Sequence, residues 1–261
     1  MLMPGAVNFF AQLSVTPVDG HQAGIVYAFW HSNMAGKAVI ALLVMGSIFS
    51  WSVMVSKFYM VRRARIETRR FLKRFRTARK PLAIYQTREA YPGSPAYAVY
   101  LAGCKELTFH LLGTTEIDDT FSTRVAEADR ISPVAMNAVR SALEREVGEQ
   151  ALRMEDRMTV LATAVSGAPF LGLLGTVWGV MDTFSAIAEQ GSASLTTMAP
   201  GVSGALITTV TGLCVAIPAM FGYNFLVVTL RGMTVELDNF AAELASAFEH
   251  RYLVTGSPAP R

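Results

Sequence analysis

One charge-free stretch constrains the fold of this chain most: no Asp, Glu, Lys or Arg occurs from Gln190 to Leu230. Two further stretches, residues 38–56 and 158–181, are also free of charge and mostly apolar. A helix of about 20 apolar residues crosses the hydrocarbon core of a bilayer. Only 16% of the residues are charged, whereas soluble domains contain about 25%. We therefore predict an all-α integral membrane protein whose three transmembrane helices cover residues 38–56, 158–181 and 203–230.

The basic residues indicate the orientation of these spans. Nineteen of the 23 Lys and Arg residues lie between Lys57 and Arg157, and basic residues next to a span stay in the cytoplasm. Three crossings place the two termini on opposite sides. The regions outside the spans are thus predicted to be an outer segment over 1–37, a cytoplasmic helical domain over 57–157, an outer link over 182–202 and a cytoplasmic helical tail over 231–261.

Long helices are predicted to extend each span into the cytoplasm. Eleven basic residues lie between Arg62 and Arg88, and we favour a solvated extension of the first span over a site for anionic lipid. Nucleic acid is the least favoured partner, because no recognition module accompanies the charge. Ser132-Pro133 resembles an N-cap followed by a first helical proline, and apolar periodicity after it predicts one helix that enters the second span directly. The apolar stripes of these helices need neighbours, which predicts a homo-oligomer.

No residue pattern indicates an enzyme, a cofactor or a metal site. The chain has no metal-ligand cluster, no phosphate-binding glycine loop and no nucleophile constellation. Its two cysteines, Cys104 and Cys214, are interpreted as small buried apolar residues without a disulfide. Asp182 and Glu189, at the outer end of the second span, are interpreted as solvated caps.

Small residues mark the two later spans. Glycine and threonine at helical spacing let membrane helices approach closely. The positions assigned to this packing are Gly172, Gly175 and Gly179 in the second span, and Gly201, Gly204 and Thr208 in the third. For a membrane protein in general, packing alone is the favoured interpretation of such residues. The alternative is that some hydroxyls line a narrow hydrated path, and Thr176 and Thr209 are the candidates because both lie near mid-depth.

Any proton carrier must come from outside this chain. Carboxylates within spans are typical of proton pathways, but none of the three predicted spans contains an acid or a base. A threonine hydroxyl donates one hydrogen bond and accepts others, yet it has no pKa that suits a proton relay. The sequence therefore predicts that a partner supplies the carboxylate.

Several segments of the spans resemble a known family. GLLGTVWGVMDTF at 172–184, APG at 199–201, ALITT at 205–209 and AIPAMFGYN at 216–224 are similar to the TolQ/ExbB branch of the MotA/TolQ/ExbB proton-channel family. The exit of the first span, SWSVMVSKFYMVRR at 50–63, resembles that branch more weakly. The similarity extends over most of residues 38–230.

The resemblance implies a homo-pentamer in the inner membrane of a bacterium, with the N-terminus in the periplasm and the C-terminus in the cytoplasm. The ring would enclose single-span helices of an ExbD/TolR-like partner, whose aspartate carries the proton, and would act on a TonB- or TolA-like protein. Thr176 and Thr209 correspond to the two pore threonines of the family. Gly204 departs from it, because relatives often have a glutamate at this position.

The expected function is therefore that of a proton-motive-force energiser subunit that works on the cell envelope within the membrane lipids. A flagellar- or gliding-type stator subunit and a non-conducting membrane scaffold are the alternatives.

Overall fold

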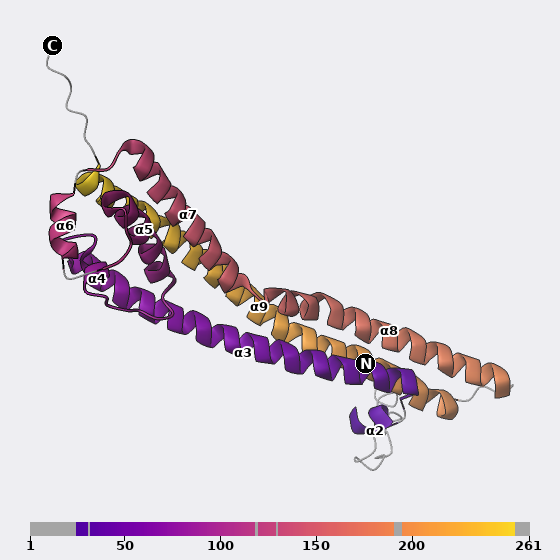
Figure 1. Cartoon of the computed structure of the whole chain (residues 1–261). Helices are drawn as coiled ribbons and strands as arrows, with labels where there is room; N and C mark the ends of the chain where they lie inside the picture. Colours follow the sequence, from indigo (N-terminus) through magenta and orange to yellow (C-terminus); the bar gives the residue numbers. More distant parts are fainter. Residues whose placement is uncertain (1–24, 31, 118–119, 129, 191–194, 254–261) are drawn as a thin grey trace, which may run out of the picture. The chain divides into compact units, whose positions relative to one another are not determined.

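The structure, a computed structural model, describes residues 25–253 apart from 31, 118–119, 129 and 191–194. Residues 1–24 of the predicted outer segment and residues 254–261 of the predicted tail lie outside the described part. The described residues fold into helices joined by short connections (Figure 1). These helices are α2 (Ile25–Trp30), α3 (Met34–Thr77), α4 (Ala83–Gln86), α5 (Pro95–Leu112), α6 (Phe121–Glu127), α7 (Pro133–Glu155), α8 (Met158–Gln190) and α9 (Leu195–Tyr252).

Three of the helices are long and apolar enough to cross a membrane. They are Met34–Thr77, Met158–Glu189 and Met198–Tyr252, and each contains one of the predicted spans. The prediction of an all-helical chain with three candidate membrane helices is confirmed. The third helix also continues without a break to Tyr252, so the predicted helical continuation of the last span is confirmed up to that residue.

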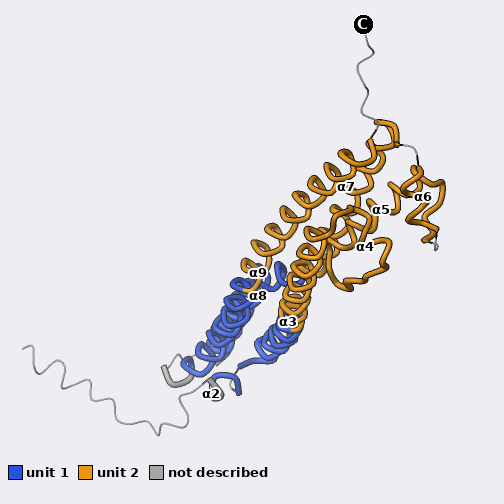
Figure 2. The backbone as a smooth tube through the Cα atoms, turned by 90° about the vertical axis from the view of Figure 1, so that its left-hand side faces the viewer, with its two compact units in different colours: residues 1–51, 160–221 blue, residues 52–159, 222–261 orange. Residues whose placement is uncertain are grey.

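The chain divides into two compact units (Figure 2). The first contains residues 1–51 and 160–221, and the second contains residues 52–159 and 222–261. Helices α3 and α9 contribute residues to both units. The two units are described separately below.

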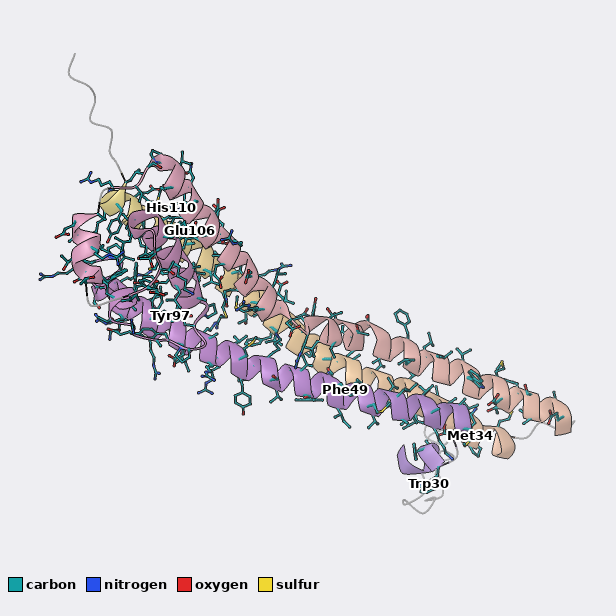
Figure 3. The ribbon with its side chains drawn as sticks, in the orientation of Figure 1. Trp30, Met34, Phe49, Tyr97, Glu106 and His110 are labelled. Atoms are coloured by element: carbon teal, nitrogen blue, oxygen red, sulfur yellow. The ribbon has the colours of Figure 1, made fainter. Side chains whose placement is uncertain are left out.

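The first unit is built from the start of α3, from α8 and from the first part of α9. Its buried contacts are small: Leu43 packs with Ala168 and Ala216. Large apolar side chains point outward instead, and Figure 3 shows Met34 and Phe49 along α3, which are 83% and 65% exposed. Exposed apolar surface on this scale is typical of a membrane or subunit interface.

The second unit has a conventional aromatic core. Phe71 of α3 is fully buried, and its ring lies 5.6 Å from that of Tyr97 and 5.6 Å from that of Phe240. Tyr100 of α5 is also fully buried, and its hydroxyl accepts a hydrogen bond from the Tyr85 amide at 2.9 Å. Burial raises the pKa of Tyr100 far above its usual value, so this phenol stays neutral and serves as a structural hydrogen-bonding group.

Helix α7 begins as predicted. The Ser132 side chain accepts a hydrogen bond from the Ala135 amide at 3.2 Å, and a proline occupies the first turn. Helix α7 packs on α5 so closely that a Cβ atom at Gly103 would lie 2.5 Å from Cδ2 of Leu143. The N-cap and this packing fix α7 in the second unit.

The prediction of one helix from Pro133 into the second span is wrong. Helix α7 ends at Glu155 and α8 starts at Met158, with Arg157 in the left-handed region at φ 61°. The last carbonyls of a helix need partners, and the buried ammonium of Lys57 donates to the Met154 carbonyl at 3.0 Å. Apolar periodicity runs through this break, so the pattern did not reveal a stop that a distant lysine stabilises.

One of the two cysteine predictions is also wrong. Cys104 is buried, but Cys214 is exposed on α9, and both thiols are free. The small size of the cysteine in an apolar helix did not decide which face it occupies.

Candidate functional site

The contact between α8 and α9 in the first unit depends on three glycines of α8. A Cβ atom would lie 2.8 Å from the Thr208 carbonyl oxygen if it were added at Gly172, and 2.7 Å from Oγ1 of Thr208 at Gly175. At Gly179 it would lie 2.7 Å from Cβ of Ala205. Any side chain at these positions would push the two helices apart, so all three glycines lie in the contact between α8 and α9.

The glycines of α9 do not share one role. Gly201 lies against the Thr183 side chain of α8. Gly204 faces away from α8, because a Cβ atom there would lie 2.9 Å from Cα of Ser32 and 3.2 Å from the Ala28 carbonyl oxygen. Backbone of α2 and of Ser32 thus occupies the space next to Gly204, and a glutamate at this position would have to displace that backbone.

Three threonine hydroxyls meet where the two helices are closest. Oγ1 of Thr176 lies 3.2 Å from Oγ1 of Thr208 and within hydrogen-bonding contact of Oγ1 of Thr209. The Gly172 carbonyl accepts from Thr208 at 2.9 Å and from Thr209 at 3.2 Å, and the Ala205 carbonyl accepts from Thr208 at 2.7 Å. The two candidate path threonines are therefore in direct contact, and Thr208, predicted only as a packing residue, is the fully buried centre of the cluster.

Counting donors and acceptors shows what this hydroxyl cluster can do. Each carbonyl oxygen has two lone pairs, and one of them already accepts the helical amide four residues later. The Gly172 and Ala205 carbonyls thus have room for two hydroxyl protons, whereas the cluster holds three. The third proton lies in the contact between Thr176 and Thr209, which are both only partly buried. There one hydroxyl donates to the other, so this proton reaches an acceptor from outside the helix pair only when that hydroxyl turns away from its partner.

A second polar group lies at the other end of the first unit. The Asn33 side chain caps α3 by accepting from the Gly36 amide at 2.9 Å, and its amide group donates to the carboxylate of Asp182. The Ser32 hydroxyl beside it is buried and has no hydrogen-bond partner within the described residues. Asp182 is exposed, as predicted, but it also joins α8 to the start of α3, which the sequence did not indicate.

Within residues 25–253, apart from the undescribed positions, no group of three or more His, Cys, Asp or Glu residues could hold a metal ion. The site in the first unit consists of hydroxyls, carbonyls and close-packed glycines. It can donate and accept hydrogen bonds to a carboxyl group, but it has no ionisable group of its own.

These features define a class: a multi-pass α-helical membrane protein with a hydroxyl cluster between two glycine-packed helices. Comparison with known proteins shows which family the chain resembles. The model of the MotA/TolQ/ExbB proton channel family matches residues 113–239, which include α8 with Thr176 and the part of α9 with Thr208 and Thr209.

Named relatives agree with this match. The chain is 29% identical over 239 residues to the Tol-Pal system protein TolQ of Haemophilus influenzae, with 88% of this chain and 95% of the relative covered. It is 41% identical over 116 residues to the biopolymer transport protein ExbB of Xanthomonas campestris, with 44% of each covered. It is 28% identical over 216 residues to ExbB of Salmonella typhimurium, with 83% of this chain and 82% of the relative covered. The family match and these relatives support the TolQ/ExbB branch that the sequence motifs predicted.

Proposed function

We propose that this protein is the channel-scaffold subunit of a proton-motive-force energiser of the TolQ/ExbB type. It would couple proton flow across the inner membrane to mechanical work on the cell envelope, and it would act in transport rather than as an enzyme. The observation that carries the proposal is the hydroxyl cluster of Thr176, Thr208 and Thr209, which lies inside the matched family region.

The cluster suits a carboxyl group that arrives on a partner helix. A carboxylate buried in an apolar wall costs free energy unless it receives hydrogen bonds. The proton in the contact between Thr176 and Thr209 can provide one such bond by leaving its neutral partner, and a bond to a charged group is worth about 1.5–3 kcal/mol. When the carboxyl group takes up a proton, it no longer needs this donor and can leave the cluster.

The remaining parts of the proposal follow the family. We propose a homo-pentamer with its N-terminus in the periplasm and its C-terminus in the cytoplasm. The ring would enclose an ExbD/TolR-like single-span partner with one intramembrane aspartate and would pass work to a TonB- or TolA-like protein. The concentration of basic residues between Lys57 and Arg157 supports this orientation, and the exposed apolar faces of the first unit support an oligomer.

The test is proton flux into liposomes that contain the full chain together with such a partner. Thr176→Val and Thr209→Val each remove a hydroxyl of the cluster with little change in volume, and we expect flux to fall roughly 10- to 100-fold for a bond of the size given above. Thr176→Ser keeps the hydroxyl and should retain flux.

Thr211→Val is the matched control. The Thr211 hydroxyl donates only to the Ile207 carbonyl of its own helix, at 2.8 Å, so this variant should conduct like the wild type. Equal flux in the Thr176, Thr209 and Thr211 variants would refute the role of the cluster.

Two other outcomes would favour the alternatives. Flux no higher than that of empty liposomes under every activating condition would favour a non-conducting scaffold. Co-purification with a partner that has a peptidoglycan-binding domain of the flagellar kind would favour a stator.

A further inference from the structure

A second site lies in the other unit, on the outer face of α3 and α9. A groove of about 340 Å³ separates the two helices near the inner ends of the first and third predicted spans. Its lining is almost entirely apolar and consists of Met54, Val55, Phe58, Tyr59, Gly222, Phe225 and Leu226.

A glycine lets α3 approach α9 at this groove, because the Met54 side chain occupies the space next to Gly222. At Gly222 a Cβ atom would collide with the Met54 sulfur, so α9 presents bare backbone to α3 here. The rings of Phe58 and Phe225 line the groove with centroids 6.4 Å apart, and these side chains are 48% and 55% exposed. The groove therefore opens outward and offers aromatic and aliphatic contacts to a long apolar group.

The charge changes abruptly beside the groove. Arg62 and Arg65 follow Phe58 by four and seven residues on α3, which places all three on one face of the helix. The two arginines begin roughly 6 and 10 Å further along the axis. Both are exposed, and neither forms an ion pair with any described residue. By contrast, the ammonium of Lys57 is buried and donates to the Met154 carbonyl, so it faces inward.

We propose that this groove is a specific site for one phospholipid of the cytoplasmic leaflet with an anionic headgroup, which revises the solvated interpretation of the basic stretch for Arg62 and Arg65. One acyl chain lies along the rings of Phe58 and Phe225, and the phosphate and headgroup are bound by Arg62 and Arg65. Tyr59, which is 66% exposed, lies at the depth where aromatic side chains are enriched in membrane proteins.

A lipid fits the charge pattern better than a second copy of the same surface. Two copies docked through this groove would bring Arg62 and Arg65 of each close together, and like charges repel. An anionic lipid neutralises them, and each basic residue near such a surface contributes roughly a five-fold gain in affinity.

The test measures the affinity of the delipidated full-length protein in detergent for phosphatidylglycerol and for phosphatidylcholine. Native mass spectrometry detects the bound lipid. We expect phosphatidylglycerol to bind more tightly than phosphatidylcholine. The double variant Arg62→Gln/Arg65→Gln should weaken the binding of phosphatidylglycerol about 30-fold, because two basic residues are lost. It should leave the binding of phosphatidylcholine unchanged. Gly222→Leu fills the groove and should weaken both lipids.

Lys73→Gln/Arg79→Gln is the matched control, because it removes two exposed basic residues that lie well beyond the groove. Both affinities should stay within about two-fold of the wild type, which is less than the roughly five-fold effect of one basic residue beside the headgroup. Equal binding of the two lipids to the wild type, or equal losses in both double variants, would overturn the proposal. Displacement of the lipid by soluble glycerol phosphate would overturn it as well, because the arginines would then bind a free anion. Lipid found only on dissociated copies of the chain would also overturn it, because another copy would then cover the groove.

The proposal assumes that α3 and α9 lie in a membrane but does not depend on proton conduction. Flotation of the reconstituted protein with liposomes tests the membrane placement separately. A lipid site that fails while flux persists would leave the proposed function intact.

Discussion

The close contact between α8 and α9 gives a prediction that can be worked out from distances. Gly172→Ala would place a Cβ atom 2.8 Å from the Thr208 carbonyl oxygen and 3.0 Å from Cα of Thr209. Both neighbours are backbone atoms, so no side-chain rotation relieves the overlap and the helices must separate locally. Overpacking of this kind typically costs about 1–3 kcal/mol.

Alanine also has a higher intrinsic helix propensity than glycine, by about 0.8–1 kcal/mol. This gain offsets part of the overpacking cost when Gly172→Ala is compared with the wild type. Gly167→Ala on the same helix provides the control, because a Cβ atom at Gly167 would have no neighbour within 4 Å. The difference between the two variants isolates the overlap. We expect Gly172→Ala to be less stable than Gly167→Ala by about 1–3 kcal/mol.

The measurement is the free energy of unfolding in mixed micelles, with SDS as the denaturant and helical circular dichroism as the signal. A difference below about 0.5 kcal/mol between the two alanine variants would refute the argument, since it is smaller than the lower limit for overpacking. Gly172→Ala should also reduce proton flux if the hydroxyl cluster must keep its spacing.

Three further predictions concern the second unit. Burial raises the pKa of the Cys104 thiol, so this thiol should not react with maleimide in the native protein. In a Cys214→Ser variant we therefore expect no labelled thiol in the native state and one after unfolding in SDS. Labelling of the native state would contradict the burial of Cys104. Ser132→Ala should lower the free energy of unfolding, measured by thermal denaturation, by about 1 kcal/mol because α7 loses its N-cap. Ser132→Asp keeps a hydrogen-bond acceptor at this position and should unfold like the wild type. The guanidinium of Arg74 lowers the pKa of Glu89. This pair therefore stabilises the fold above the unfolded pKa of about 4.3, and the stabilisation is lost as pH falls through the lower folded pKa. Glu89→Gln should make the melting temperature less dependent on pH in this range, and an unchanged pH profile would contradict the pairing.

Much of the fold was accessible from local patterns. Charge-free stretches predicted the three long apolar helices, and Ser132-Pro133 predicted the start of α7, because each signal depends only on neighbours in the chain. The end of α7 did not follow in the same way. The carbonyl of Met154 is satisfied by Lys57, which lies 97 residues earlier, and no local pattern records such a partner.

The arrangement of the candidate site did not follow from the sequence. Thr176 and Thr209 were selected by depth and by the family resemblance, whereas the structure places them in direct contact and adds Thr208, whose hydroxyl lies against carbonyls of both helices. The spacing of glycines predicted that α8 would pack closely. Which face of α9 meets α8 depends on tertiary contacts, and Gly204 was for this reason grouped with residues whose contact it does not share.

The position of Gly204 against Ala28 and Ser32 has a consequence for related chains. A chain with an acidic residue at position 204 could not have this backbone at its present distance, so the two features exclude each other. Introducing a glutamate alone should be poorly tolerated, whereas a chain that also exchanges the segment around Ser32 should accept it. Among related proteins, the residue at position 204 and the length or composition of the segment before α3 should therefore vary together.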